Sequence, residues 1–290
     1  MKLRGERAKR LLHWAGGMLA LAGILFVVLR LRSHAAEIDF ARFTAHDWSA
    51  LAGLATVYAA ANVLLALAWR DLLAFCGEAT GPRWAIRTYG ISQLGKYVPG
   101  NIFHMAGRQA LGMSAGLAAW PLARSALWEL GLISVAGGLF ALLVGSFVFP
   151  AIPVGLAVVL FVLASVFALW AALRLVEWRV ARALGQQMLF LVVSGSVFIG
   201  SLALVMPAPP QFGLWPAVCG AYVVAWLAGL VTPGAPAGMG VREVVLLFLL
   251  SDITRAPDLI LAVLLGRIVS VLGDALFFAA VFLLKNGRPD

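Results

Sequence analysis

Apolar residues follow one another in long runs along this chain of 290 residues, with few polar positions between them. The stretches 48–69, 130–173 and 183–241 contain no charged residue. A helix that crosses a bilayer needs about 20 mostly apolar residues, so each stretch is long enough for one span or more. The pattern predicts an all-α fold, a polytopic helical bundle integral to a membrane, with residues 1–290 forming a single transmembrane domain.

Chain breakers divide the apolar runs into separate spans. Short loops are expected at Pro150 and Pro153, and again at Pro207, Pro209 and Pro210. We predict spans near residues 13–30, 48–70, 119–147, 152–173, 186–206, 214–231 and 257–284. The segments 84–116 and 232–251 are also apolar but are broken by proline and glycine, and each fits a re-entrant hairpin or a pair of half-helices. The expected total is about 7–8 crossings.

The first broken segment contains the sequence Gly-Lys-Tyr-Val-Pro-Gly-Asn at residues 95–101. Pro99 has no backbone N–H to donate and Gly100 tolerates unusual dihedral angles, so the helix is expected to stop there. Asn101 is a favourable N-cap for a new helix that begins at Ile102. Irregular backbone at membrane depth persists only where it lines a polar cavity or is buried in protein. The break therefore predicts a site within the bundle.

A candidate head-group site follows this break. His104 and Arg108 lie four residues apart and share one face of the new helix. The free N–H groups at a helix N-terminus attract phosphate or carboxylate, and Arg108 offers the same anion a planar fork of donors. We therefore expect Lys96, Asn101, His104 and Arg108 to bind an anionic head group. The alternative is that Lys96 and Arg108 only extend to the membrane interface.

The second broken segment is rich in helix-breaking residues. They are Pro233, Gly234, Gly238 and Gly240. The segment leads directly into Arg242 and Glu243. Two broken segments, one in each half of the chain, are typical of a substrate site in a transporter. The functional hypothesis places Arg242 opposite Arg108 across one cavity. The alternative is structural: Glu243 complements the dipole of the following helix, and Arg242 forms an ion pair elsewhere.

Three further charges, Glu129, Arg267 and Asp274, lie within or beside predicted spans. An ionisable group in a span costs about 2.5–3.5 kcal/mol on insertion scales, and such groups usually face the interior and pair. Arg267 and Asp274 are seven residues apart and therefore share one face of the last helix. We expect Glu129 and Asp274 to pair with Arg108, Arg242 or Arg267. Proton coupling is the other role open to these acids.

Two short motifs are rejected. Residues 90–97 come within one residue of a P-loop, but Tyr97 stands where magnesium binding requires Ser or Thr. The sequence Gly-Met-Ser-Ala-Gly at 112–116 matches the nucleophile elbow, which needs a strand–turn–helix context. Gly112 and Gly116 are expected instead to allow close helix packing. With no nucleotide motif, no cofactor is expected.

Composition supports a membrane bundle and excludes other classes. Hydrophobic residues make up 62% of the chain and charged residues 12%, whereas a soluble domain carries about twice that charge. The net charge of +9 does not indicate nucleic-acid binding, because the basic residues collect at span ends rather than beside aromatic side chains. Cys76, Cys219 and the four histidines show no disulfide or zinc spacing, so no metal site is expected.

Basic residues also predict the orientation in the membrane. The N-terminal segment contains Lys2, Arg4, Arg7, Lys9 and Arg10. A second basic cluster consists of Arg174, Arg179 and Arg182. Because positive charge is retained on the cytoplasmic side, we expect a multi-pass protein of the cell inner membrane with both clusters, and the N-terminus, in the cytoplasm.

The two broken segments resemble the signatures of one known family. Residues 95–101, followed by Gly107 and Arg108, resemble the first signature of the flippase-like family that includes the transmembrane region of lysylphosphatidylglycerol synthases. Residues 233–243 resemble the second signature, usually Pro-Gly-Gly-Leu-Gly-Val-Arg-Glu, and Glu129 matches an acidic position in the third span. The resemblance covers essentially the whole chain. It departs where Ala-Pro-Ala is inserted in the second loop and where methionine replaces the usual leucine.

The resemblance implies lipid translocation rather than lipid aminoacylation. The expected substrate is an anionic or phosphate-bearing lipid, either a phospholipid or a prenyl-phosphate-linked glycolipid, and no enzymatic activity is expected. Membrane lipids are thus the expected partners, with a lipid-synthesis enzyme as a further candidate. Two alternatives stay open: a membrane-embedded lipid-modifying enzyme, such as a lipid-linked glycosyltransferase that uses Glu37 and Asp39, or a non-transporting scaffold for lipid synthesis.

Overall fold

The described part of the chain is entirely helical in its regular structure. The computed structural model describes residues 43–97, 103–149, 151–206, 211–232 and 240–284. Every regular element in these ranges is a helix, which confirms the all-α class. The predicted first span, residues 13–30, lies outside the described residues.

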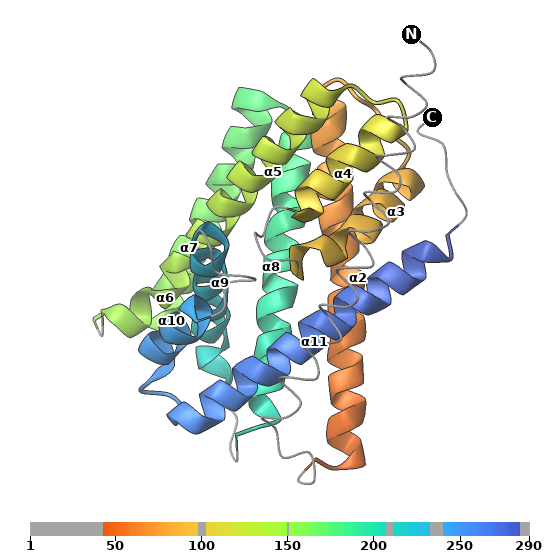
Figure 1. The fold of residues 1–290 in the computed structure, drawn as a ribbon. Helices are drawn as coiled ribbons and strands as arrows, with labels where there is room; N and C mark the ends of the chain where they lie inside the picture. Colours follow the sequence, from red (N-terminus) through yellow and green to blue (C-terminus); the bar gives the residue numbers. More distant parts are fainter. Residues whose placement is uncertain (1–42, 98–102, 150, 207–210, 233–239, 285–290) are drawn as a thin grey trace.

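The elements keep the numbering of Figure 1. They are α2 (Ala45–Phe75), α3 (Pro82–Gln93), η2 (Leu94–Tyr97), α4 (Phe103–Ser114), α5 (Ala119–Leu139), α6 (Ala141–Val148), α7 (Val154–Ala171), η3 (Ala172–Val176), α8 (Trp178–Ala203), η4 (Phe212–Leu214), α9 (Trp215–Val231), α10 (Val241–Leu250) and α11 (Ala256–Phe282).

Six helical stretches within the described ranges are long and apolar enough to cross a membrane. They cover Ala45–Phe75, Ala119–Val148, Val154–Val176, Trp178–Ala203, Phe212–Val231 and Ala256–Phe282. Each corresponds to a predicted span. One start differs: α8 begins at Trp178 instead of near residue 186, because the helix continues through Arg179 and Arg182, which the apolar pattern assigns to a loop. The architecture is that of a multi-pass membrane protein.

Helix α2 has a well-defined beginning and end. At its start, the Asp47 carboxylate accepts the Thr44 N–H at 2.8 Å and the Thr44 hydroxyl accepts the Asp47 N–H at 3.4 Å, which is a capping box. At its end, Gly77 has a φ of 101° and the Glu78 N–H bonds back to the carbonyl of Leu73. This is a glycine C-cap, which only a residue tolerant of positive φ forms without strain.

Helix α4 ends in the same way at Gly116, where φ is 100°. A Cβ at this position would have no atom within 4 Å, so the prediction that Gly116 allows close packing is wrong. The residue is required for its backbone conformation instead. Gly112 does allow close packing, because a Cβ there would lie 2.6 Å from the side chain of Leu122 in α5.

Three long helices form the centre of the bundle. α2 and α8 lie side by side, and α11 crosses them (Figure 1). Asp71 near the end of α2 pairs with Arg182 near the start of α8, so these two helices run in opposite directions. Where α11 crosses α2, a Cβ on Gly273 would lie 2.8 Å from the carbonyl oxygen of Ala55. The two backbones therefore approach each other at a position that only glycine fits.

Replacing Gly273 with valine is expected to lower the free energy of unfolding by about 1–3 kcal/mol, because overpacking forces the two helices apart. Gly131→Val is the matched control, since a Cβ on Gly131 in α5 would meet nothing within 4 Å. Thermal unfolding of both variants in detergent measures the difference. Equal unfolding midpoints for the two variants would show that the α2–α11 crossing is not tightly packed.

The short helices α3 and α4 pack against each other, and their outer ends meet at one end of the bundle (Figure 1). The Glu78 carboxylate before α3 accepts the Ala118 N–H after α4 at 3.0 Å. The inner ends also lie together, because a Cβ on Gly95 would lie 3.0 Å from the backbone nitrogen of His104. Residues 98–102, which connect these inner ends, lie outside the described residues.

Helices α9 and α10 form a second packed pair in the other half of the chain (Figure 1). The order of long helix, paired helices and long helix thus occurs twice, as α2, α3–α4, α5 and as α8, α9–α10, α11. Since α8 runs opposite to α2, the second set is inverted relative to the first. Such inverted arrangements are common among transporters.

Candidate functional site

Arg108 and Glu129 form an ion pair buried between α4 and α5. Their side chains are 3% and 7% exposed. Arg108 Nη1 donates to Glu129 Oε1 at 3.0 Å, and Nη2 lies 2.8 Å from Oε2. The second contact is an ion pair whose angle departs from that of a hydrogen bond. The guanidinium and the carboxylate are thus joined by one charge-assisted hydrogen bond and one further ionic contact.

Side chains from neighbouring helices enclose this pair. The Tyr89 hydroxyl donates to Glu129 Oε1 at 3.1 Å, and Gln187 Nε2 donates to the Glu129 carbonyl at 3.2 Å. The Arg108 guanidinium carbon lies 4.3 Å from the ring centre of Tyr89 and 5.3 Å from that of Trp69. The pairing of Arg108 with Glu129 is one that the sequence predicts. The alternative in which Arg108 extends to the interface is wrong.

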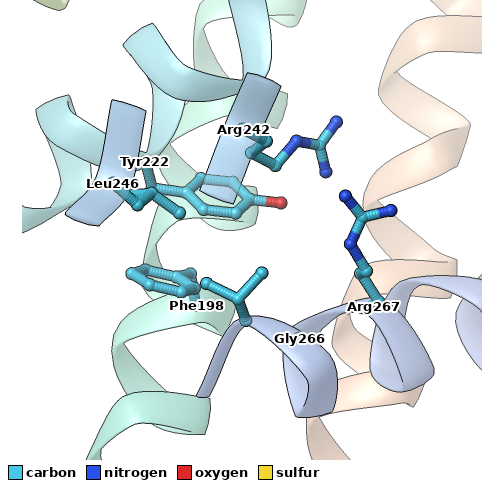
Figure 2. Close-up of a pocket in the computed structure, with 7 residues that line it drawn as sticks. Phe198, Tyr222, Arg242, Leu246, Gly266 and Arg267 are labelled. Atoms are coloured by element: carbon cyan, nitrogen blue, oxygen red, sulfur yellow. The ribbon is translucent and has the colours of Figure 1, made fainter. Parts of the chain in front are cut away.

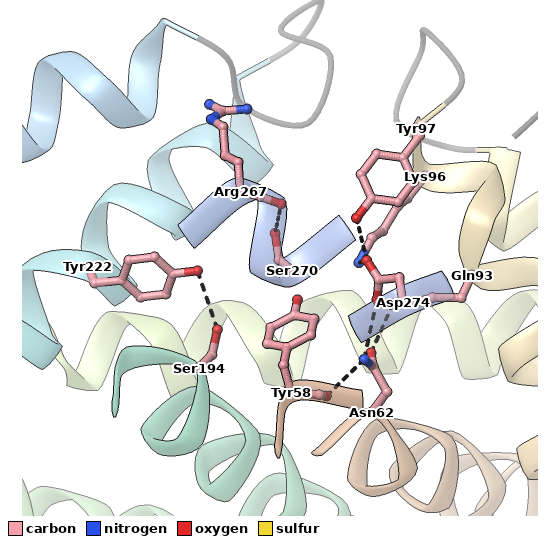
Figure 3. A network of polar contacts seen from close by, with 10 residues as sticks. All are labelled: Tyr58, Asn62, Gln93, Lys96, Tyr97, Ser194, Tyr222, Arg267, Ser270 and Asp274. Atoms are coloured by element: carbon pink, nitrogen blue, oxygen red, sulfur yellow. Dashed lines mark hydrogen bonds and ion pairs between the residues drawn. The ribbon is translucent and has the colours of Figure 1, made fainter. Parts of the chain in front are cut away.

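A second cluster surrounds Asp274 in α11, whose side chain is completely buried. Lys96 Nζ lies 2.6 Å from Asp274 Oδ2, and the Tyr97 hydroxyl donates to the same oxygen. Asn62 Nδ2 donates to the other oxygen at 3.3 Å, and Gln93 Nε2 donates to Asn62 Oδ1 at 3.1 Å (Figure 3). One carboxylate therefore connects α2, α3, η2 and α11.

The partner of Asp274 differs from the predicted one. The sequence predicts an arginine, whereas the structure gives Lys96. Arg267 shares the face of α11 but pairs with Glu243 of α10, two turns away from Asp274. The Lys96 ammonium group contacts Asp274 and lies 5.9 Å from the Tyr58 ring centre, so Lys96 does not extend to the interface. Its predicted role in binding a head group stays a prediction.

A pocket lies between helices α8, α9, α10 and α11 (Figure 2). Its lining residues are Phe198, Tyr222, Arg242, Leu246, Val263, Gly266 and Arg267. The guanidinium groups of Arg242 and Arg267 come from different helices and face each other at one side of this space (Figure 2). The free volume is about 10 Å³, room for about one water molecule. An anion the size of a phosphate therefore enters only when the side chains around this space move apart.

Glu243 is the carboxylate beside this pocket, and Arg267 Nη2 donates to its Oε1. Arg242 forms no ion pair or hydrogen bond with any residue that the structure describes. Among the described residues, three buried atoms here have no hydrogen-bond partner: Nε of Arg242, Nε of Arg267 and Oε2 of Glu243. The Arg108–Glu129 pair also contains two such atoms, so these three are open to a ligand or to water but do not identify a site by themselves.

The residue opposite Arg242 is therefore Arg267, not Arg108. The sequence hypothesis places Arg242 and Arg108 across one cavity, but Arg267 shares the pocket with Arg242. Arg108 is held by Glu129 on another face of the bundle, between α4 and α5. The error arises because both arginines follow a broken segment, and sequence spacing does not reveal which long helix each one meets.

Other predicted site residues have different outcomes. The imidazole Nδ1 of His104 is buried near the start of α4 and has no hydrogen-bond partner within the described ranges. Gly240 precedes α10 with a φ of 80°, a conformation that favours glycine. The remaining caps and breaks stay predictions because they lie outside the described residues; they are Pro99, Gly100, Asn101, Pro233, Gly234 and Gly238.

Two ion pairs occupy corresponding places in the two inverted sets of helices. Arg108 of α4 pairs with Glu129 of α5, and Glu243 of α10 pairs with Arg267 of α11. In each set, the second short helix is thus held to the long helix that follows it. The charges are exchanged between the two sets: α4 supplies the cation of the first pair, whereas α10 supplies the anion of the second pair.

Sequence reasoning missed an ion pair between Asp71 and Arg182. Arg182 Nε and Nη2 lie 2.5 and 2.6 Å from the two oxygens of Asp71, and Arg70 Nη2 lies 2.8 Å from Oδ1. Asp71 lies two residues after the end of the first uncharged run, behind Arg70, but nothing in the spacing identifies a partner so far along the chain. Asn62 was also missed, although it is the only side-chain amide within residues 48–69.

Within the described ranges, no group of three or more His, Cys, Asp or Glu side chains could hold a metal ion. Comparisons with protein-family models, with curated proteins and with solved structures found no match. The resemblance to the flippase-like family therefore depends on the two sequence signatures alone.

Proposed function

We propose that this protein is a translocase of the cell inner membrane that moves an anionic or phosphate-bearing lipid between leaflets. The substrate is a phospholipid or a prenyl-phosphate-linked lipid. The observation that carries the proposal is the convergence of Arg242 and Arg267 on one pocket. A charged residue in a span is costly and usually functional. Two arginines with a single carboxylate, Glu243, leave positive charge for an anionic head group.

In this proposal the pocket widens to admit a head group whose acyl chains stay in the bilayer. Arginine donors replace the water that a phosphate loses on leaving the surface, which lowers the cost of passage. The outer face of α10 is apolar: Val244 is 65% exposed and Phe248 is 76% exposed. An acyl chain can follow this face while the phosphate stays beside Arg242.

In this proposal α4 and α10 are half-helices that begin within the membrane. They belong to oppositely directed sets, so they run from the midplane toward opposite sides. Arg242 lies in the first turn of α10. The N-terminus of that half-helix adds its free N–H groups to the arginine donors, as in other anion sites within membranes.

Charge distribution supports an orientation. α2 ends, and α5 and α8 begin, at one end of the bundle (Figure 1). The last turns of α2, the first turns of α5 and α8, and the neighbouring α3 and η3 contain Arg70, Arg83, Arg87, Arg124, Arg174 and Arg179. At the opposite end, Asp47 lies in the first turn of α2, Asp252 follows α10, and Arg255 and Asp258 lie at the start of α11. The positive-inside rule then places the arginine-rich end in the cytoplasm. This orientation agrees with the predicted cytoplasmic N-terminus on the prediction of one span near residues 13–30, which lie outside the described residues.

Reconstitution tests the proposed activity. Purified protein is placed in liposomes that contain a head-group-labelled phosphatidylglycerol, a labelled polyprenyl phosphate or a labelled uncharged diacylglycerol. A membrane-impermeant quencher then reports which labels reach the outer leaflet. We expect the protein to accelerate movement of an anionic probe and not of the uncharged lipid. Folded protein that moves no probe, or that moves the uncharged lipid equally well, would contradict the proposal.

The alternative functions predict different mutational results. A lipid-modifying enzyme that uses Glu37 and Asp39 depends on residues outside the described ranges. Loss of function on Asp39→Asn with a harmless Arg242→Ala would favour that enzyme. Tolerance of both substitutions would favour a non-transporting scaffold.

A further inference from the structure

We propose that Glu243 is a latch that the lipid phosphate displaces from Arg267, and that this exchange releases α10 from α11. The inference rests on the proposed function and specifies how substrate binding is coupled to movement of the second helix pair. It assigns Glu243 the role of a resident anion that occupies the site when no head group is bound.

The contact between Glu243 and Arg267 is only half satisfied. One carboxylate oxygen accepts from Arg267 Nη2, whereas the other is buried and has no hydrogen-bond partner among the described residues. The Nε atoms of Arg267 and Arg242 likewise have no partner in the part of the chain that the structure describes. A phosphate presents several acceptor oxygens and pairs with two guanidinium groups at once. Exchanging carboxylate for phosphate therefore satisfies donors that the empty site leaves without a partner.

The displaced carboxylate is not left isolated. Glu243 lies in the first turn of α10, which begins at Val241. A negative side chain in this turn is stabilised by the free N–H groups and partial positive charge of the helix N-terminus. The cost of breaking the contact with Arg267 is thus reduced by the position of Glu243 itself.

Release of this contact gives α10 freedom to move while α11 stays fixed. Among the described residues, Glu243–Arg267 is the ion pair that joins α10 to α11. Two turns further along, Asp274 holds α11 to Lys96 at the inner end of the first helix pair. α11 therefore serves as a support for both pairs, and only its link to α10 includes a residue of the pocket.

A binding measurement tests the exchange separately from transport. The affinity of purified protein for a short-chain phosphatidylglycerol is compared between wild type and Glu243→Gln, which removes the competing charge and keeps the side-chain shape. We expect Glu243→Gln to bind about tenfold more tightly, a difference of about 1.4 kcal/mol. Asp252→Asn is the matched control: it removes an exposed acid just after the same helix and is expected to leave the affinity unchanged.

A distance measurement tests the movement. Spin labels are attached at Ser251→Cys at the end of α10 and Leu276→Cys in α11, both exposed positions, while the native Cys76 and Cys219 are buried. Added lipid is expected to shift the distance distribution in the wild-type background. Glu243→Gln is expected to show the shifted distribution without lipid.

The outcomes separate the latch from the translocase. Unchanged affinity in Glu243→Gln, or lipid binding that leaves the wild-type distances unaltered, would refute the latch and leave the proposed function intact. The spin-label distances in the wild-type background, measured with and without lipid, test the latch even if Glu243→Gln does not fold. Wild-type protein that binds no anionic lipid would contradict both proposals.

Discussion

Arg108→Ala is expected to lower the free energy of unfolding by about 3–5 kcal/mol, because it leaves Glu129 as a buried carboxylate without a counter-charge. The Tyr89 hydroxyl would be the only side-chain donor left to that carboxylate among the described residues. Loss of the guanidinium also leaves a gap against the ring of Trp69. The thermal unfolding midpoint in detergent measures the effect.

The double variant Arg108→Met, Glu129→Met separates charge pairing from packing. It removes both charges and fills the site with apolar side chains, so it is expected to regain most of the lost stability. Arg255→Ala is the control for loss of an exposed arginine. If Arg108→Ala unfolds at the wild-type temperature, its pairing with Glu129 is not structural, and Arg108 becomes a candidate for the head-group site again.

Arg242→Ala is expected to reduce lipid translocation by about two orders of magnitude and to leave the protein as stable as wild type. Losing a desolvated charge that binds a charged partner costs about 2–5 kcal/mol, and about 2.8 kcal/mol corresponds to a hundredfold change. Stability is retained because Arg242 has no ion pair or hydrogen bond with the described residues. Its removal therefore leaves no side chain without a partner.

Translocation and unfolding are measured on the same preparations of Arg242→Ala, with Arg255→Ala as the matched control. Arg255 precedes α11 and is exposed, so its loss is expected to change neither quantity. A loss of transport that is accompanied by a loss of folded protein would remove the argument for a ligand at Arg242. Normal transport by stable Arg242→Ala protein would place the head group elsewhere.

The predictions for Arg108→Ala and Arg242→Ala differ, although the two arginines lie in similar sequence contexts. Arg108 and Arg242 each follow a broken segment, and both lie on short helices. The structure distinguishes them by what surrounds each one: Glu129 and two aromatic rings enclose Arg108, whereas Arg242 has no described partner. Sequence spacing places residues on helix faces, but it does not show which neighbouring helix covers a face.

The helices themselves could be predicted well because hydrophobic runs, proline and glycine determine them locally. The start of α8 could not, because Arg182 looks like a loop residue until its partner Asp71 is known. The same applies to Asp274, whose partner Lys96 is distant in sequence and reaches it only through the packing of η2 on α11. Pairing across the bundle depends on tertiary packing, which periodicity does not encode.

The central claim is that the lipid phosphate occupies the pocket between Arg242 and Arg267. An experimental structure of the protein in nanodiscs of the anionic lipid that it translocates tests this claim most directly. We predict a phosphate within hydrogen-bonding distance of both guanidinium groups, with Glu243 displaced from Arg267. A head group bound at the Arg108–Glu129 pair, or an empty pocket in protein that translocates this lipid, would contradict the account.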